Sequence, residues 1–166
     1  IHHVAASAGK VFLIGDDITK VVNFSNVSQP QEMAAISGSI VDVGFQGNIA
    51  YLVNDTENRV NLHDLSDAGL KILGAIGDMY SVAVAVQSDK AYVAEYNSGF
   101  ETYNVSDPTK PTSYGKWISD KVLLAPFMVG EYMACPVFGE NELRFYEVKD
   151  ILHPQLVTTA NIRVGS

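Results

Sequence analysis

Short apolar runs recur along the chain and predict β-strands rather than helices. The central runs cover residues 11–14, 50–53, 91–94 and 132–135. Each run is followed by a second apolar position that is flanked by turn-forming polar residues. These four positions are Val27, Leu65, Val105 and Val148, and successive ones are 38, 40 and 43 residues apart. A period of about forty residues built from short apolar runs predicts repeated β-units, because one small sheet buries its faces only when a neighbour stacks on it.

The third repeat gives the clearest prediction of the unit. Residues 81–86 and 90–95 form a hairpin across a tight polar turn, and residues 99–105 alternate with period two. Residues 112–118 follow a turn containing Asp107 and two prolines, which favour a reversal of the chain. Each repeat is therefore predicted to be a four-stranded sheet.

The predicted fold class is all-β, a β-propeller of four four-stranded blades. The blades are expected at residues 1–36, 37–76, 77–117 and 118–160, with 161–166 as a C-terminal tail. Propellers range over about four to eight blades. The sequence leaves two arrangements open: a closed four-bladed ring, or part of a larger propeller completed by additional chain or by a partner.

Composition and charge limit the classes of partner that the chain is expected to bind. The chain has 166 residues, of which 47% are hydrophobic and 18% charged, as expected for a folded domain with one substantial core. Its net charge of −8 argues against nucleic acid or an anionic membrane, which both attract clustered Lys and Arg. The sequence has no apolar run of about 18 residues, so no membrane span is predicted.

The termini and the single cysteine bear on localisation. The sequence begins with Ile1 rather than Met, which indicates either a removed signal peptide or a segment of a longer polypeptide. Cys135 is the only cysteine, so an internal disulfide is excluded. It lies in a predicted strand, where a buried and inert thiol is expected.

The third repeat resembles a known family. Residues 91–94, the phrase from Gly99 to Pro108 and the closing Lys110-Pro111 are similar to the LVIVD repeat, and four copies cover nearly the whole chain. The second copy has Ala68 in place of the first proline and the fourth has Ile151. The resemblance implies a propeller found mostly in exported and cell-surface proteins, with a binding or adhesive role. It implies no particular reaction, because a fold alone does not determine chemistry.

Candidate binding residues are expected on the inner strands and their connecting loops, which line the channel of a propeller. The residues at corresponding positions on the four predicted inner strands are His3, Asp42, Ser81 and Ala125. His3 and Asp42 are suitable metal ligands. However, His2 and His3 are adjacent in a strand and point to opposite faces, so the pair cannot both face the channel. No metal site is favoured, and His3 with Asp42 is the candidate if one exists.

Other candidates lie toward the blade ends. Trp117, Phe127 and Phe138 break the repeat pattern and are candidates for a contact surface at the channel mouth and rim. Acidic clusters at residues 16–17, 54–58 and 140–142 share one rim. Calcium or another divalent metal suits such oxygen-rich loops, but the ligand spacing of a dedicated calcium loop is missing, so no cofactor is predicted.

Further polar residues have structural explanations. The recurring Asp67, Asp107 and Asp150 are expected to form turns. Asn54 is predicted to be the most accessible glycosylation acceptor if the protein passes through a secretory pathway.

The predicted function is a non-enzymatic interaction module, exported or at the cell surface, that binds protein or glycan or serves in an extracellular assembly. One alternative is a metal-assisted hydrolase or lactonase-like propeller that uses His3 and Asp42. Another is a purely structural repeat segment of a filament or scaffold, associating through exposed blade edges. A homo-oligomer, or an additional chain that completes the ring, is also left open. Nucleophile motifs are missing from the sequence, which argues against nucleophilic catalysis.

Overall fold

The computed structural model describes residues 1–96 and 99–162, and in that part of the chain all regular structure is β. The first sheet contains β1 (His3–Ser7), β2 (Lys10–Ile14), β3 (Ile18–Asn23) and β4 (Gln31–Ser37). The second contains β5 (Ile40–Gln46), β6 (Ile49–Asn54), β7 (Arg59–Asp64) and β8 (Ile72–Ile76). The third contains β9 (Ser81–Gln87), β10 (Lys90–Glu95), β11 (Gly99–Asn104) and β12 (Thr112–Trp117). The fourth contains β13 (Phe127–Val129), β14 (Tyr132–Pro136), β15 (Glu142–Glu147) and β16 (Gln155–Asn161).

In every sheet the strands are antiparallel and follow one another in chain order. Each inner hairpin turns through left-handed backbone, at Gly9, Gly47, Ser88 and Gly130. Such positive φ angles match the twist of two-residue hairpins. The third and fourth strands of each sheet show the same register shift, for example between Thr102 and Tyr103. The sheets therefore repeat one another in detail.

The structure corrects the alignment of the first repeat. The residue after the third strand donates its backbone N–H to the inner hairpin turn in each sheet, at 2.8–2.9 Å, and these donors are Phe24, Leu65, Val105 and Val148. Phe24, not Val27, is thus the first-sheet equivalent of Val105. The prediction was wrong by three residues because Asn23-Phe24-Ser25 and Asn26-Val27-Ser28 both read Asn, apolar, Ser, and each asparagine forms the same local turn.

The core lies between the sheets rather than within one layer. We call the side of a sheet that faces the following sheet its forward face, and the other side its backward face. On the forward face of the second sheet, Tyr51 and Val53 pack against Ala91 and Val93 on the backward face of the third. The first and second sheets, and the third and fourth, pack in the same way. Alternation along each central strand thus supplies one apolar row to each neighbour.

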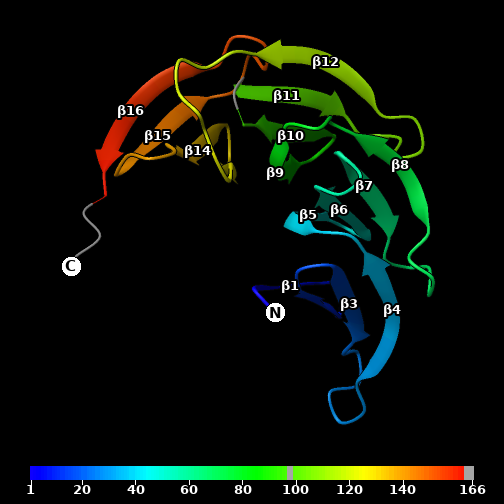
Figure 1. Ribbon diagram of the computed structural model, residues 1–166. Helices are drawn as coiled ribbons and strands as arrows, with labels where there is room; N and C mark the ends of the chain where they lie inside the picture. The colour runs from blue at the N-terminus through cyan, green and yellow to red at the C-terminus, as the bar shows by residue number, and fades with distance from the viewer. Residues whose placement is uncertain (97–98, 163–166) are drawn as a thin grey trace.

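The four sheets are arranged along an open arc (Figure 1). The first and fourth sheets stand at opposite ends of the arc, and the inner strands face its concave side. The expected four four-stranded blades are confirmed. The described chain does not close into a four-bladed ring but forms an open arc. Each end of the arc consequently presents a sheet face that no neighbouring sheet in the described chain covers.

The fourth sheet departs from the others at its inner strand. β13 has three residues, whereas β5 and β9 have seven. Before it, residues 118–126 form an irregular segment in which Ala125 has a positive φ of 40°. β4 and β16 end one residue beyond the expected blade limits of 36 and 160. Of the expected tail, residues 163–166 lie outside the described residues.

Candidate functional site

An open hollow of about 430 Å³ lies where the inner strands β5, β9 and β13 meet. Its lining is mostly apolar, from residues such as Phe45, Val86 and Phe127, and Asp42 adds a carboxylate. Phe127 is 66% exposed. Two of the candidates from the sequence, Asp42 and Phe127, thus line one hollow beside the inner strands.

The Asp42 carboxylate is held by the neighbouring sheet. Its Oδ2 accepts a hydrogen bond of 2.9 Å from the backbone N–H of Val84. Burial raises the pKa of Asp42, while the hydrogen bonds from Val84 and Val43 and the nearby charge of His3 oppose that rise. Because its carboxylate caps a backbone donor between two sheets, Asp42 has a structural role in addition to lining the hollow.

The histidines at the start of β1 do not converge on a ligand site with Asp42. His2 contacts Asp16 through Nε2 at 2.7 Å, and His3 is exposed. Over residues 1–96 and 99–162, the structure brings together no group of three or more His, Cys, Asp or Glu side chains that could hold a metal ion. The arrangement therefore offers at most the pair of His3 and Asp42.

Ser81 is buried and stabilises a turn. Its Oγ accepts a hydrogen bond of 2.9 Å from the N–H of Asp78, and Asp78 Oδ1 in turn accepts one of 2.8 Å from the N–H of Tyr80. Gly77 has a φ of +77°, and a Cβ there would lie 2.4 Å from Ser81 Oγ. This tight turn before β9 leaves Met79 and Tyr80 facing solvent.

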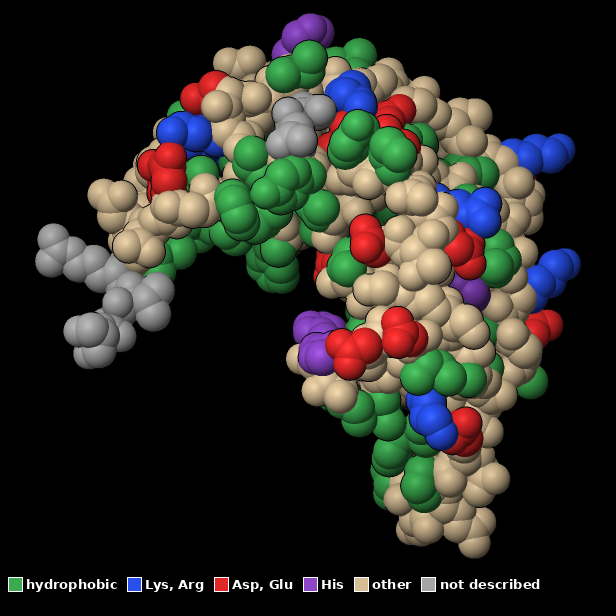
Figure 2. Space-filling model, in the orientation of Figure 1, with side chains coloured by type: hydrophobic (Ala, Val, Ile, Leu, Met, Phe, Trp, Pro, Cys, Tyr) green, Lys and Arg blue, Asp and Glu red, His purple; other side chains and the backbone are tan. Residues whose placement is uncertain are grey.

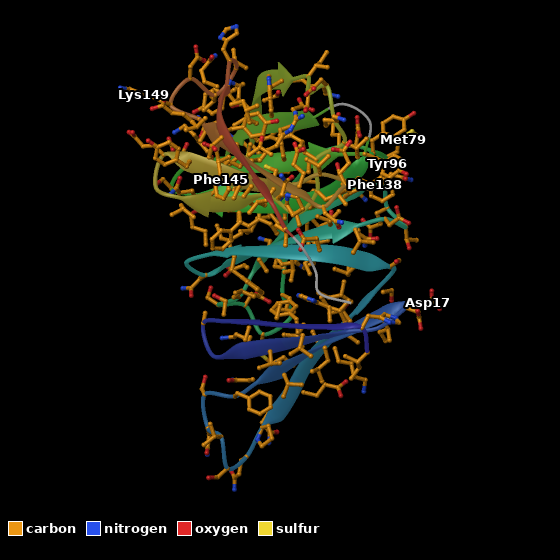
Figure 3. All side chains as sticks on the ribbon, turned by 90° about the vertical axis from the view of Figure 1, so that its left-hand side faces the viewer. Asp17, Met79, Tyr96, Phe138, Phe145 and Lys149 are labelled. Atoms are coloured by element: carbon orange, nitrogen blue, oxygen red, sulfur yellow. The ribbon has the colours of Figure 1, made fainter. Side chains whose placement is uncertain are left out.

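A group of exposed aromatic side chains lies at that turn. Tyr96 follows β10, Phe138 follows β14, and their rings stack edge to face with centroids 5.8 Å apart. Together with Met79 and Tyr80, they form what we call the rim patch, in which each side chain is 43–59% exposed. Figure 3 shows Met79, Tyr96 and Phe138 on the same side of the molecule as Asp17, and Figure 2 shows hydrophobic side chains gathered there.

Backbone hydrogen bonds fix the rim patch. The N–H of Tyr96 donates to the carbonyl of Tyr80 at 2.9 Å, which ties the loop after β10 to the turn before β9. The N–H of Phe138 donates to the carbonyl of Val122 at 2.9 Å. These two bonds hold the backbone of Tyr96 and Phe138 at the positions that bring their rings together.

A buried charge lies beside the patch. The side chain of Glu95, the residue before Tyr96, is fully buried and forms an ion pair of 2.6 Å with Lys116. Burial raises the pKa of Glu95, and Lys116 opposes that rise. The last residue of β10 thereby anchors the outer strand β12 next to the exposed Tyr96.

Acidic residues dominate the loops on this rim. They are the loops that follow the second strand of each sheet and those that join one sheet to the next. In their described residues, the one basic side chain is Lys121, and the acidic residues are Asp16, Asp17, Asp55, Glu57, Asp78, Asp120 and Glu140. Several are paired, as in Lys121 with Glu140 at 2.6 Å and Arg144 with Asp120 at 2.7 Å. The rim therefore combines an aromatic surface with negative charge.

The remaining aromatic candidate lies apart from the rim patch. Trp117 is half-buried between the third and fourth sheets, stacked on Phe100 at 5.7 Å and edge-on to Tyr146 at 4.8 Å. Its ring mainly joins two sheets. Of the aromatics singled out in the sequence, Phe138 is thus the one that the structure places in the rim patch.

Two expectations about polar residues have opposite outcomes. Asn54 is wrong as an accessible glycosylation acceptor, because its side chain is 1% exposed and its Oδ1 accepts the N–H of Glu57 at 3.1 Å. The turn-forming role of Asp67, Asp107 and Asp150 is confirmed. In each, Oδ1 accepts the backbone N–H of the residue two positions later, at 2.7, 3.0 and 3.1 Å.

Met79, Tyr80 and Tyr96 were missed in the sequence. The sequence did contain a signal, namely a large apolar residue in a loop that has Gly or polar residues in other repeats. Tyr96, for example, follows the second strand of its sheet, where the first two sheets have Gly15 and Asp55. That these loops meet follows from the stacking of the third and fourth sheets, which no local pattern reveals.

Comparison with solved structures shows that the fold is a β-propeller. A functionally unknown protein from Desulfotomaculum acetoxidans matches 96% of this chain at 12% identity, with a TM-score of 0.76 and 56% of its own chain covered. BamB from Moraxella catarrhalis matches 96% at 11% identity, with a TM-score of 0.66 and 47% covered. The β-propeller domain of Cps50 (Swd1) from Myceliophteria thermophila matches 99% at 10% identity, with a TM-score of 0.70 and 59% covered.

The chain spans about half the length of these three solved structures. No protein-family model matches it, and neither does a curated protein. In residues 1–96 and 99–162, the structure contains no helix long and apolar enough to cross a membrane.

Proposed function

We propose that the chain is a non-enzymatic interaction module, exported or at the cell surface, that binds a protein partner through the rim patch. The observation that carries the proposal is the exposed cluster of Met79, Tyr80, Tyr96 and Phe138, in which the backbone N–H groups of Tyr96 and Phe138 are hydrogen-bonded. Exposed aromatic and methionine side chains are typical of interface centres. The resemblance of the repeats to the LVIVD family supports the surface location and the binding role.

The charge around the patch indicates the chemistry of the partner. Acidic loops on the same rim attract Lys and Arg, while the aromatic rings bind apolar side chains and also the face of a guanidinium group. The partner is therefore a protein segment that combines basic residues with aliphatic or aromatic ones. Its association rate falls with rising ionic strength, because the attracting charges are exposed.

A random peptide library displayed on phage tests this function. Peptides selected on the wild-type chain are expected to combine Lys or Arg with apolar residues, and to bind the Tyr96→Ala/Phe138→Ala variant at least tenfold more weakly. The matched control is Val27→Ala, which removes an exposed apolar side chain from the turn between β3 and β4. It should bind like the wild type.

Two outcomes contradict the proposal. If the selected peptides bind the double variant as tightly as the wild type, the contact lies on a surface other than the rim patch. A parallel glycan array on which the wild-type chain binds a sugar class, and loses it in the double variant, assigns the rim patch to carbohydrate instead.

A further inference from the structure

The forward face of the fourth sheet is apolar and open. Strand pairing places Phe127, Ala134 and Phe145 side by side on this face, and Val129 beside Tyr132. Phe127, Val129 and Tyr132 are 66%, 57% and 45% exposed. Figure 3 looks onto this end of the arc, with Phe145 toward the viewer.

The position of Phe145 is buried in the other three sheets. In the strand pairing, Phe145 occupies the same position as Val21, Leu62 and Thr102 in the other sheets. Each of these three residues is at most 2% exposed beneath the following sheet. The forward face of the fourth sheet therefore has the pattern of an interface between sheets, without the sheet that would cover it.

The backward face of the first sheet is the counterpart at the other end. Val4 and Leu13 lie side by side on it, as do Val11 and Val22. Leu13 corresponds to Leu52, Val93 and Cys135, which are at most 1% exposed against the preceding sheet. Its open neighbour Val4 is 57% exposed.

One charged residue on this backward face is compatible with burial at an interface. Lys20 lies beside Leu13 and pairs with Glu32 at 2.9 Å. The corresponding positions in the other sheets, which face covered interfaces, are also polar: Asn61, Glu101 and Arg144. A polar residue at this register is thus a normal part of the interface.

We propose that a second copy of this chain covers both open faces. The three interfaces inside the chain each join a forward face to a backward face, and one face of each kind is left over. Two arcs joined head to tail pair the fourth sheet of each copy with the first sheet of the other, closing a ring. Each arc covers about half of the longer propellers BamB and Cps50 (Swd1), as this closure requires. The proposal goes beyond the binding function, because the rim patch takes no part in it.

The oligomeric state of the 166-residue chain tests the proposal. Sedimentation equilibrium at micromolar concentration should give twice the chain mass of 18.0 kDa. Phe145→Glu and Leu13→Glu, on opposite faces, should each reduce the mass to that of a monomer, since each places a carboxylate in both interfaces of the ring. Phe127→Glu and Val4→Glu repeat the test at more exposed positions, where the folded sheet tolerates the charge, and circular dichroism checks that each variant is folded. Val27→Glu is the matched control and should remain dimeric.

Three results overturn the proposal. A wild-type monomer shows that the faces do not recognise each other. A dimer broken by the fourth-sheet variants but not by the first-sheet variants is a face-to-face dimer of fourth sheets, and the reverse result identifies first sheets. A dimer that all folded variants retain is held by another surface.

Discussion

The rings of Tyr96 and Phe138 meet edge to face at 5.8 Å although they belong to different sheets. Tyr96 extends from the third sheet and Phe138 from the fourth, so the contact links two repeats at their exposed rim. Aromatic pairs contribute about 0.5–1.5 kcal/mol beyond their burial. A double-mutant cycle with Tyr96→Ala and Phe138→Ala, measured by urea unfolding, should give a coupling energy in this range. Strictly additive single variants would show that the contact contributes nothing to stability.

Tyr51 gives a prediction about the interface between the second and third sheets. Its side chain is 1% exposed and packs on the backward face of the third sheet. Tyr51→Ala leaves a cavity there and should lower the free energy of unfolding by about 3–5 kcal/mol. Val27→Ala, at a position 79% exposed, should change it by less than about 0.5 kcal/mol. Chemical denaturation of both variants measures the difference, and equal effects would be incompatible with the packing.

His63 should make stability depend on pH. Its ring is buried, Nδ1 lies 2.8 Å from the carbonyl oxygen of Leu70, and burial lowers its pKa below 6.5. As the pH falls, the unfolded chain therefore binds a proton at His63 before the folded chain does. The stabilisation that is present above pH 6.5 is lost as the pH falls below 6.5 and through the lowered pKa of the folded state. His63→Phe removes this titration.

The measurement is the difference in unfolding free energy between the wild type and His63→Phe from pH 7.5 to pH 5. The wild type should lose stability relative to the variant by up to about 1.4 kcal/mol per pH unit. Common effects of the other histidines cancel in this difference. A constant difference over the whole range would contradict a depressed pKa.

Cys135 should be unreactive while the protein is folded. Its thiol is buried beneath the third sheet, and burial raises its pKa to about 12. Because only the thiolate attacks disulfide reagents, Ellman's reagent at pH 8 should label a negligible fraction of the native chain within minutes. In concentrated guanidinium chloride the same sample should react with one thiol per chain. Rapid labelling of the native protein would show that the sheets separate readily.

The fold was predictable because its pattern is local. Each central strand carries two interleaved apolar rows, and each turn has its own aspartate or glycine, so residues 90–95 and Asp107 identify their elements without knowledge of distant contacts. The error at Val27 arose where two consecutive phrases matched the same local rule. Only the backbone bond from Phe24 to Gly9, a contact between neighbouring strands, distinguishes them.

The candidate site was less predictable because it depends on contacts between sheets. The sequence placed His3 and Asp42 on neighbouring inner strands, but not the bond that Asp42 accepts from Val84. It found Phe138 as an irregular aromatic but not its partner Tyr96. Asn54 looked exposed in a polar run, whereas its side chain folds inward to close the turn after β6.

The aspartate turns also bear on how the chain folds. Asp67, Asp107 and Asp150 each accept a hydrogen bond from a backbone group only two residues away, so the outer hairpin of a sheet closes without any contact from another repeat. The strands that each turn joins are also adjacent in sequence, which keeps loop-closure entropy small. Folding can consequently start in any of the three sheets that contain these turns, and the stacking of sheets is the later, cooperative step.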